Sequence, residues 1–180
     1  MPIEEAVDAM AELDKSGKVH PIAALQTEYP LWTRDPGVTG TLAACRKNGV
    51  AFVACSPPGR GFLTGAFTKP EALSEGDYRR RSPRLTEKTS SNLKLVEKVQ
   101  ALAASKGVTA SHVAFAWVLA QGEDIIPISG TKRRSDPDRN IAALDVMQNP
   151  AELSEINEAF APDTAAGMHC PESLIASVSA

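Results

Sequence analysis

Two uninterrupted runs of apolar residues constrain the fold more than any other feature of the sequence. Val50 to Cys55 and Ile125 to Ile128 are apolar throughout, which is typical of strands in a parallel sheet that is covered on both faces. A third apolar run, Ile22 to Thr27, ends in polar residues and is also predicted to be a buried strand. Strands and helical segments alternate between residues 22 and 145, so we expect parallel strands joined by right-handed crossovers. Three strands are too few to close a barrel.

Apolar residues at helical spacing, with local start and stop signals, place the helices. Gly49 is predicted to end one helix, Thr109 to cap another, and Asn149 with Pro150 to open the last. The predicted helices span residues 2–16, 42–48, 90–105, 110–120, a segment that begins near 135, and 150–160. The first helix is expected to bury one apolar stripe, which consists of Ile3, Val7, Met10 and Leu13.

Three connecting segments are expected to lack regular structure. Residues 31–41 are interpreted as a loop because they contain Pro36, Gly37 and Gly40. Residues 56–88 are rich in proline and glycine, and a loop of this length is usually functional or disordered. The tail after residue 160 is expected to be loose.

Charge and composition exclude several classes of partner. The 180 residues carry 19 Lys and Arg against 22 Asp and Glu, a formal net charge of −3, so neither a nucleic acid nor a membrane surface is expected as a partner. No apolar run approaches the ~20 residues that span a bilayer, and the N-terminus has no signal-like pattern. We therefore expect one cytoplasmic domain over residues 1–180.

Three widely spaced cysteines, Cys45, Cys55 and Cys170, support neither a disulfide framework nor a zinc site.

Three short stretches that follow predicted strands contain residues suited to binding. Gln26 to Tyr29 lies at the end of the first strand, where parallel α/β folds bind ligands. Ser56 to Gly61 has glycines that allow close approach of a phosphate, and Ser56 and Arg60 are potential donors. Gly130 to Arg134 places cations before a predicted helix, as an anion site requires. Each stretch also has an explanation without function. The first could be the polar end of a strand that reaches the surface, the second a Pro/Gly turn, and the third solvent-exposed charge.

Taken together and in order, these stretches resemble the aldo/keto reductase family. The matching segments are Gln26 to Trp32, Val53 to Gly65 and Pro127 to Arg133, and Ala114 to Leu119 is similar to the family's helix before its last strand. They resemble strands six, seven and eight of a (β/α)8 barrel. The resemblance therefore implies an α/β fold, a partial TIM barrel of about three parallel strands with surrounding helices. It also implies NADP(H) as the cofactor, bound in extended form across the carboxyl ends of the strands.

The resemblance assigns cofactor contacts residue by residue. Gln26 would contact the nicotinamide amide. The pyrophosphate and ribose would be lined by Ser56, Pro57, Gly59 and Gly61, and the adenosine 2′-phosphate region by Gly130, Thr131 and Lys132, with Asn140 at the adenine. Segment 56–88 would fold over the cofactor or the substrate. Three positions depart from the family's usual residues: Cys55 replaces an aromatic that stacks on the nicotinamide, Pro58 a leucine, and Arg139 a glutamate.

The family's catalytic Asp, Tyr, Lys and His match nothing in this sequence, so no catalytic residue and no metal ligand is assigned. Residues 17–22 also run directly into the first predicted strand, where family members have a further strand and helix. One hypothesis is an incomplete, C-terminal part of a carbonyl reductase, active only if another polypeptide supplies an N-terminal half. The other is a non-catalytic nucleotide-binding or scaffolding fragment. Unpaired sheet edges and an exposed apolar face predict that the isolated chain dimerises, aggregates or is molten.

Overall fold

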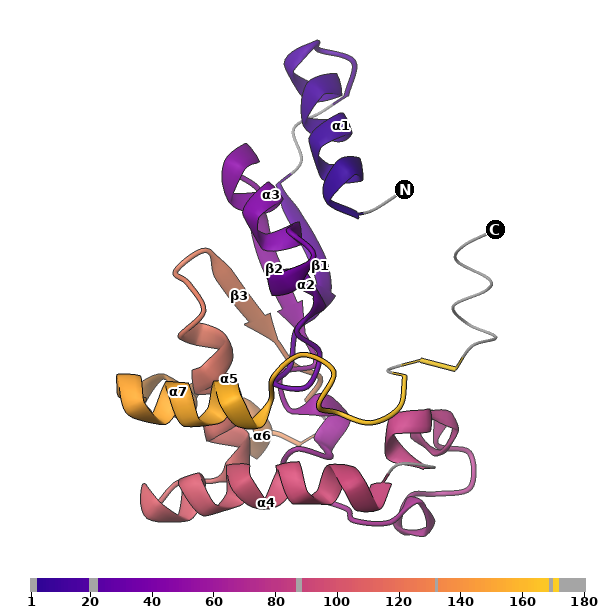
Figure 1. The fold of residues 1–180 in the computed structure, drawn as a ribbon, viewed down its shortest axis with the longest axis vertical. Helices are drawn as coiled ribbons and strands as arrows, with labels where there is room; N and C mark the ends of the chain where they lie inside the picture. Colours follow the sequence, from indigo (N-terminus) through magenta and orange to yellow (C-terminus); the bar gives the residue numbers. More distant parts are fainter. Residues whose placement is uncertain (1–2, 20–22, 87–88, 132, 169, 172–180) are drawn as a thin grey trace.

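A three-stranded parallel sheet forms the centre of the fold in the computed structural model of the protein (Figure 1). The structure describes residues 3–19, 23–86, 89–131, 133–168 and 170–171. The strands are β1 (Ala24–Glu28), β2 (Ala51–Cys55) and β3 (Ile125–Ile128), hydrogen-bonded in the order β1-β2-β3. The three predicted parallel strands are therefore confirmed, and β1 continues one residue further than expected.

Seven α-helices accompany the sheet within the described residues. The predicted helix ends are confirmed by local geometry: Gly49 follows α3 with a φ of 67°, and the Thr109 and Asn149 side chains accept backbone N–H groups at the starts of α5 and α7. The helices are α1 (Ile3–Lys15), α2 (Asp35–Val38), α3 (Thr41–Asn48), α4 (Thr89–Ser105), α5 (Ala110–Leu119), α6 (Ser135–Ile141) and α7 (Pro150–Ala159). No helix of the described chain has the length and apolar character needed to cross a bilayer.

The two faces of the sheet have different surroundings. Phe52 and Ala54 of β2 are fully buried, on the face that packs against α3 and α5. On the other face Gln26, Val53 and Ile126 lie in register across the three strands. Ile126 is 51% exposed, so this face is open. In a closed barrel it would form the interior.

Aromatic side chains form the core where the strands end. Tyr29, which directly follows β1, packs against Phe52 and Trp117 with ring centroids 5.6 and 5.4 Å apart. Trp32 stacks on Phe62 with centroids 5.4 Å apart and 20° between the ring planes. The loops after β1 and β2 are therefore joined to each other by aromatic packing. Stacked rings contribute more stability than the burial of their area alone.

The connection between β2 and α4 is packed against this core. It contains four single turns of 3-10 helix, and Phe62, Leu63 and Leu85 are at most 1% exposed. The turns are η1 (Gly59–Gly61), η2 (Pro70–Ala72), η3 (Tyr78–Arg81) and η4 (Pro83–Leu85), and a fifth, η5 (Ala142–Asp145), follows α6. The alternative of a disordered segment is therefore wrong for residues 56–86, because their apolar side chains have partners in the core. Residues 87 and 88 lie outside the described part.

The predicted stripe of α1 is only partly correct. Val7 and Ala11 are the buried residues of this helix, whereas Ile3, Met10 and Leu13 are each at least 40% exposed. The helix packs on α3 at one end of the molecule (Figure 1), so a single neighbour covers one side of it. Periodicity identified the helix correctly but could not identify its neighbour.

The loop and tail predictions also need correction. Residues 35–38 form α2 inside the segment that was expected to be a loop. The tail is not loose up to residue 168, because Arg84 Nε donates to the carbonyl oxygen of Gly167 at 3.2 Å. Asn92, which is fully buried in α4, donates to the carbonyl oxygens of Arg84 and Ala166 and accepts the N–H of Ala166, all at 2.9 Å.

Candidate functional site

A cavity of about 810 Å³ opens where β2 and β3 end. The loop after β2, the start of α5, the residues after β3, and α6 form its walls. Four residues predicted to bind a cofactor line it, namely Ser56, Gly61, Gly130 and Asn140. Three arginines also line it, Arg60, Arg79 and Arg139. The cavity thus joins polar groups, glycines and positive charge from two separate parts of the sequence.

The other predicted residues lie elsewhere. Gln26 is exposed on the open face of β1, Pro57 and Gly59 are buried, and Thr131 is exposed. None of these four is among the described residues that line the cavity. Lys132 lies outside the described residues. The structure therefore brings segments 56–61 and 129–140 together at one cavity, whereas Gln26 is not part of the lining of that cavity. The cofactor contacts of all nine residues stay predictions.

The loop after β2 has an uncommon backbone conformation. Ser56 and Arg60 have positive φ values, 58° and 59°, which cost a residue with a side chain about 1–2 kcal/mol. Gly59 and Gly61 also have positive φ, without that cost. Non-glycine residues keep such conformations where their surroundings fix them, and such positions cluster at ligand sites. The strain at Ser56 and Arg60, which both line the cavity, marks this loop as a candidate binding element.

A chain of charged side chains holds this loop from two sides. Arg60 Nη2 donates to Glu28 Oε2 at 2.7 Å, and the two side chains are only 15% and 16% exposed. Arg79 Nη1 donates to the carbonyl oxygen of Arg60 at 3.1 Å. Arg79 is paired in turn with Asp77, Nη2 to Oδ2 at 2.6 Å. The loop is therefore fixed to the end of β1 by an ion pair and to η3 by a hydrogen bond from Arg79, whose guanidinium is itself held by Asp77.

Sequence reasoning did not identify Glu28, Asp77 and Arg79 as parts of this arrangement. It treated Arg60 as a donor to a phosphate, whereas Arg60 Nη2 is bonded to Glu28. One signal for that pair was available, because Glu28 is the register partner of Cys55 in the parallel sheet. An acid that ends one strand and a base in the loop after the next strand are therefore expected to meet. No comparable signal connects Arg79 to residue 60.

Hydrogen bonding and burial act on two ionisable groups near the loop. The side chain and the backbone N–H of Arg79 donate to Asp77 and lower its pKa to about 2, so the Asp77–Arg79 pair stays ionised at neutral pH. Burial, followed by the nearby charge of Glu28, raises the pKa of the Cys55 thiol. Cys55 therefore presents a neutral thiol to the cavity. The three cysteines are unpaired, and no cluster suited to a metal ion occurs among the described residues.

The opposite wall of the cavity is formed by residues after β3 and in α6. Asn140 Nδ2 donates to Ser129 Oγ at 2.8 Å, which links α6 to the end of the strand. At Gly130 no atom lies within 4 Å of the position that a β-carbon would take. This wall therefore offers polar side chains and open space next to the backbone.

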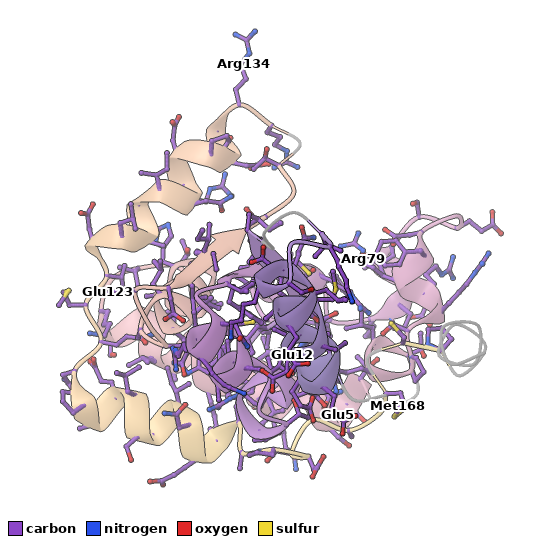
Figure 2. The ribbon with its side chains drawn as sticks, turned by 90° about the horizontal axis from the view of Figure 1, so that it is seen from above. Glu5, Glu12, Arg79, Glu123, Arg134 and Met168 are labelled. Carbon is purple, nitrogen blue, oxygen red and sulfur yellow. The ribbon has the colours of Figure 1, made fainter. Side chains whose placement is uncertain are left out.

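Charge on this wall is mixed. Asp136 accepts the backbone N–H of Arg133 at 3.0 Å, and its carboxylate lies 3.8 Å from Arg139 Nη2. Figure 2 shows Arg134 projecting outward from the start of α6, away from the rest of the molecule. Of the stretch predicted as an anion site, Gly130 is the described residue that lines the cavity. Positive charge on this side comes instead from Arg139, which the sequence showed only as a departure from the family.

Comparison with known sequences finds one family along most of the chain. A family model described as "Aldo/keto reductase family" matches residues 4–161. The aldo-keto reductase yakc of Schizosaccharomyces pombe, whose name specifies NADP(+), is 41% identical over 149 residues. That match covers 81% of this chain and 44% of yakc, so the chain spans less than half the length of this relative.

Solved structures show the same fold. A thermostable aldo-keto reductase, Tm1743, crystallised with the inhibitor epalrestat, superposes with a TM-score of 0.57 at 24% identity over 88% of this chain and 55% of its own. The glycerol dehydrogenase AKR11B4 from Gluconobacter oxydans gives a TM-score of 0.70 at 19% identity over 89% and 55%. The expected α/β fold, a partial TIM barrel of three parallel strands with surrounding helices, is therefore confirmed.

Proposed function

The chain belongs to the aldo/keto reductase family, and we propose that it forms the NADP(H)-binding portion of an oxidoreductase that converts carbonyls to alcohols. The observation that carries this proposal is the cavity at the ends of β2 and β3, which brings Ser56, Gly61, Gly130 and Asn140 together. Parallel α/β folds bind their ligands at this end of the strands. The name of yakc supports NADP(H) as the ligand.

The residues of the cavity suit a nucleotide that carries phosphates. Its volume lies within the ~300–1,000 Å³ typical of ligand pockets. Because Arg60 and Arg79 already form short ion pairs, Arg139 is the lining arginine best able to attract an anion. Following the resemblance, Gln26 would contact the nicotinamide. The pyrophosphate and ribose would be contacted by Ser56, Pro57, Gly59 and Gly61. The adenosine end would be contacted by Gly130, Thr131, Lys132 and Asn140. NADPH, when bound, supplies a hydride. This chain's own residues would hold and orient it.

Carbonyl reduction also needs a proton donor, and neither described tyrosine fits that role. Tyr29 is buried in the core, where burial raises its pKa. Tyr78 lines the cavity but is 65% exposed, and the adjacent Arg79 is already paired with Asp77. No lysine is among the described residues of the lining. Positioned acids contribute about 10²–10⁴-fold to such reactions, so we infer that catalysis needs groups from outside these 180 residues.

The alternative is a non-catalytic nucleotide-binding or scaffolding protein. The lack of a tyrosine–lysine pair among the described residues of the cavity favours it, whereas the open, largely apolar sheet face favours a protein that is completed by a partner. A nucleotide-binding fragment would still bind NADPH, whereas a scaffolding fragment would not. The proposed oxidoreductase and this alternative differ in whether a polypeptide that supplies an acid restores reduction of a small carbonyl compound.

NADPH is expected to bind the chain, and Gly130→Val to weaken that binding at least about tenfold, or ~1.4 kcal/mol. The added side chain would stand in open space, so the fold should be unchanged while part of the cavity is filled. Gly76→Val is the matched control, because Gly76 also has no atom within 4 Å of its β-carbon position, has no positive φ and lies outside this cavity. Fluorescence titration with NADPH measures both. Equal affinities of the two variants would contradict the proposed site.

The isolated chain is expected to show no NADPH-dependent reduction of a nitrobenzaldehyde-type carbonyl. The reason is the missing acid, since the hydride alone leaves the oxygen unprotonated. The assay follows loss of NADPH absorbance against a blank without protein. Turnover above the blank that disappears in Gly130→Val would show that the chain is catalytic by itself.

The isolated chain is also expected to self-associate through the open sheet face. Ile126 and Ile128 are 51% and 39% exposed there, beside strand edges that have no partner in the described structure. Ile126→Lys should shift size-exclusion profiles toward the monomer. Met147→Lys, at a residue 80% exposed outside the sheet, should not. A monodisperse wild-type monomer that melts cooperatively would contradict this expectation.

A further inference from the structure

A second cavity, of about 420 Å³, lies beside the segment that follows α7. Among the described residues it shares no lining residue with the first cavity. Its walls are the loop after β1 with α2, Arg84 of η4, and parts of residues 161–168. Figure 1 shows this segment leaving α7 and passing back by α2. Hydrogen bonds from Arg84 and Asn92 to Gly167 and Ala166 hold it in place.

Arg84 contributes a guanidinium whose hydrogen-bond partners in the described structure are neutral groups. Its Nη1 donates to the carbonyl oxygen of Trp32 at 3.0 Å and to Thr33 Oγ1 at 2.9 Å, and its Nε donates to the carbonyl oxygen of Gly167 at 3.2 Å. The guanidinium carbon lies 5.5 Å from the centroid of the Trp32 ring. Four of the five guanidinium N–H groups sit on Nη1 and Nη2, so these contacts leave donor capacity.

Arg34 contributes a second guanidinium in the same situation. Its Nη1 donates to the carbonyl oxygen of Phe160 at 3.4 Å, and its guanidinium carbon lies 4.6 Å from the centroid of the Trp117 ring. No ion pair of the described structure includes Arg34 or Arg84. Loss of solvation lowers the pKa of both arginines. Two partly buried arginines that line one cavity and take part in no ion pair of the described structure are unusual in a folded protein.

The carboxylates near this cavity do not neutralise the two arginines directly. The charges of Glu28 and then Asp35 oppose the effect of burial on the pKa of Arg84, but Glu28 is paired with Arg60. Asp35 and Asp163 line the cavity and are exposed, and neither forms an ion pair with Arg34 or Arg84. These two carboxylates favour a ligand with a single negative charge, because they repel a dianion more strongly than a monoanion.

We propose that this second cavity binds a small organic carboxylate, with its charged end on Arg34 and Arg84. A planar carboxylate matches the fork of a guanidinium. The remaining lining includes Val38 and Met168, which are 62% and 50% exposed, and it gives an apolar body of the ligand a surface to cover. Inorganic phosphate fits less well, because it lacks that body and is partly a dianion at neutral pH. The proposal does not depend on the function of the first cavity.

Benzoate is the probe that tests the proposal on the complete 180-residue chain. We expect saturable binding in the millimolar range or tighter by isothermal titration calorimetry. Met168→Glu should weaken it at least about tenfold, because this exposed side chain lines the cavity and the change adds a negative charge without affecting the core. Met147→Glu places the same charge outside the cavity and should leave benzoate affinity unchanged. Arg34→Gln should also weaken binding, and a thermal melt of this variant separates loss of the site from loss of the fold.

Two further ligands decide the chemistry. Benzamide keeps the shape of benzoate without the charge and should not bind measurably, and inorganic phosphate should bind more weakly than benzoate. No saturable benzoate binding, equal binding of benzamide, or tighter binding of phosphate would each overturn the proposal. Unchanged affinity in Met168→Glu would overturn its location. Gly130→Val should leave benzoate binding intact, so failure of the NADPH site and failure of this site are distinguishable.

Discussion

Gly59→Ala is expected to lower the free energy of unfolding by about 2–5 kcal/mol. Gly59 has a φ of 56° and is buried. A β-carbon there would lie 2.8 Å from Leu63 Cγ and Cδ1 and 2.9 Å from Trp32 Cε2. Backbone strain accounts for about 1–2 kcal/mol, and overpacking of the core for about 1–3 kcal/mol. The clash involves the Trp32–Phe62 stack, so the aromatic junction between the two loops would have to move.

Gly49→Ala separates these two contributions. Gly49 has a φ of 67°, close to that of Gly59, but no atom lies within 4 Å of its β-carbon position. The control should therefore lose only about 1–2 kcal/mol, the cost of the backbone conformation. Urea unfolding followed by fluorescence of the buried Trp32 and Trp117 measures both variants. Equal losses would show that the packing around Gly59 relaxes freely.

Glu28→Gln is expected to cost about 3 kcal/mol of stability and to weaken NADPH binding with it. Removal of one member of a buried ion pair takes away the charge that balances the other, which costs ~3–5 kcal/mol, and Arg60 and Glu28 are mostly buried. Glutamine keeps the size of the side chain and the oxygen that accepts from Thr33. The loss of stability in Glu28→Gln would therefore measure the effect of removing the negative charge. Because Arg60 stands at a strained position in the cavity wall, loss of its ion pair with Glu28 should let the binding loop change conformation.

A double-mutant cycle tests this expectation. Adding Arg60→Met to Glu28→Gln removes the charge that Glu28 balanced, so the double variant should be more stable than the sum of the two single losses predicts. The Arg46–Asp124 pair is the control, because its side chains are 47% and 35% exposed and Asp124→Asn should cost only about 0–1 kcal/mol. Urea unfolding and NADPH titration give the two readouts. Additive losses at Glu28 and Arg60 would show that the pair is not coupled.

Local signals predicted the elements well. The apolar run at β2, the stop at Gly49 and the caps at Thr109 and Asn149 each depend on residues close together in sequence, and each is found in the structure. The exposed side of α1 shows the limit of this reasoning, since periodicity identifies an apolar stripe but not whether a neighbour covers it.

The site was predictable only in part, for the same reason. Ser56 and Gly130 follow strands that pair in parallel, and therefore they meet at one cavity. The support from Arg79 to Arg60 joins residues on a packed irregular segment, whose path no sequence pattern specifies. The second cavity depends on Arg84 reaching Gly167 across 83 positions, a contact that only the finished fold reveals.

The amide of Asn92 has a consequence for the order in which the molecule is completed. It is fully buried, and two of its three hydrogen bonds are made with Ala166, 74 residues later. While the chain is being synthesised, α4 emerges long before that partner, and an unsatisfied buried amide costs about 1–3 kcal/mol. The N-terminal end of α4 is therefore expected to stay hydrated until the last helix has been made. Docking of residues 161–168 then buries the Asn92 amide and completes its hydrogen bonds.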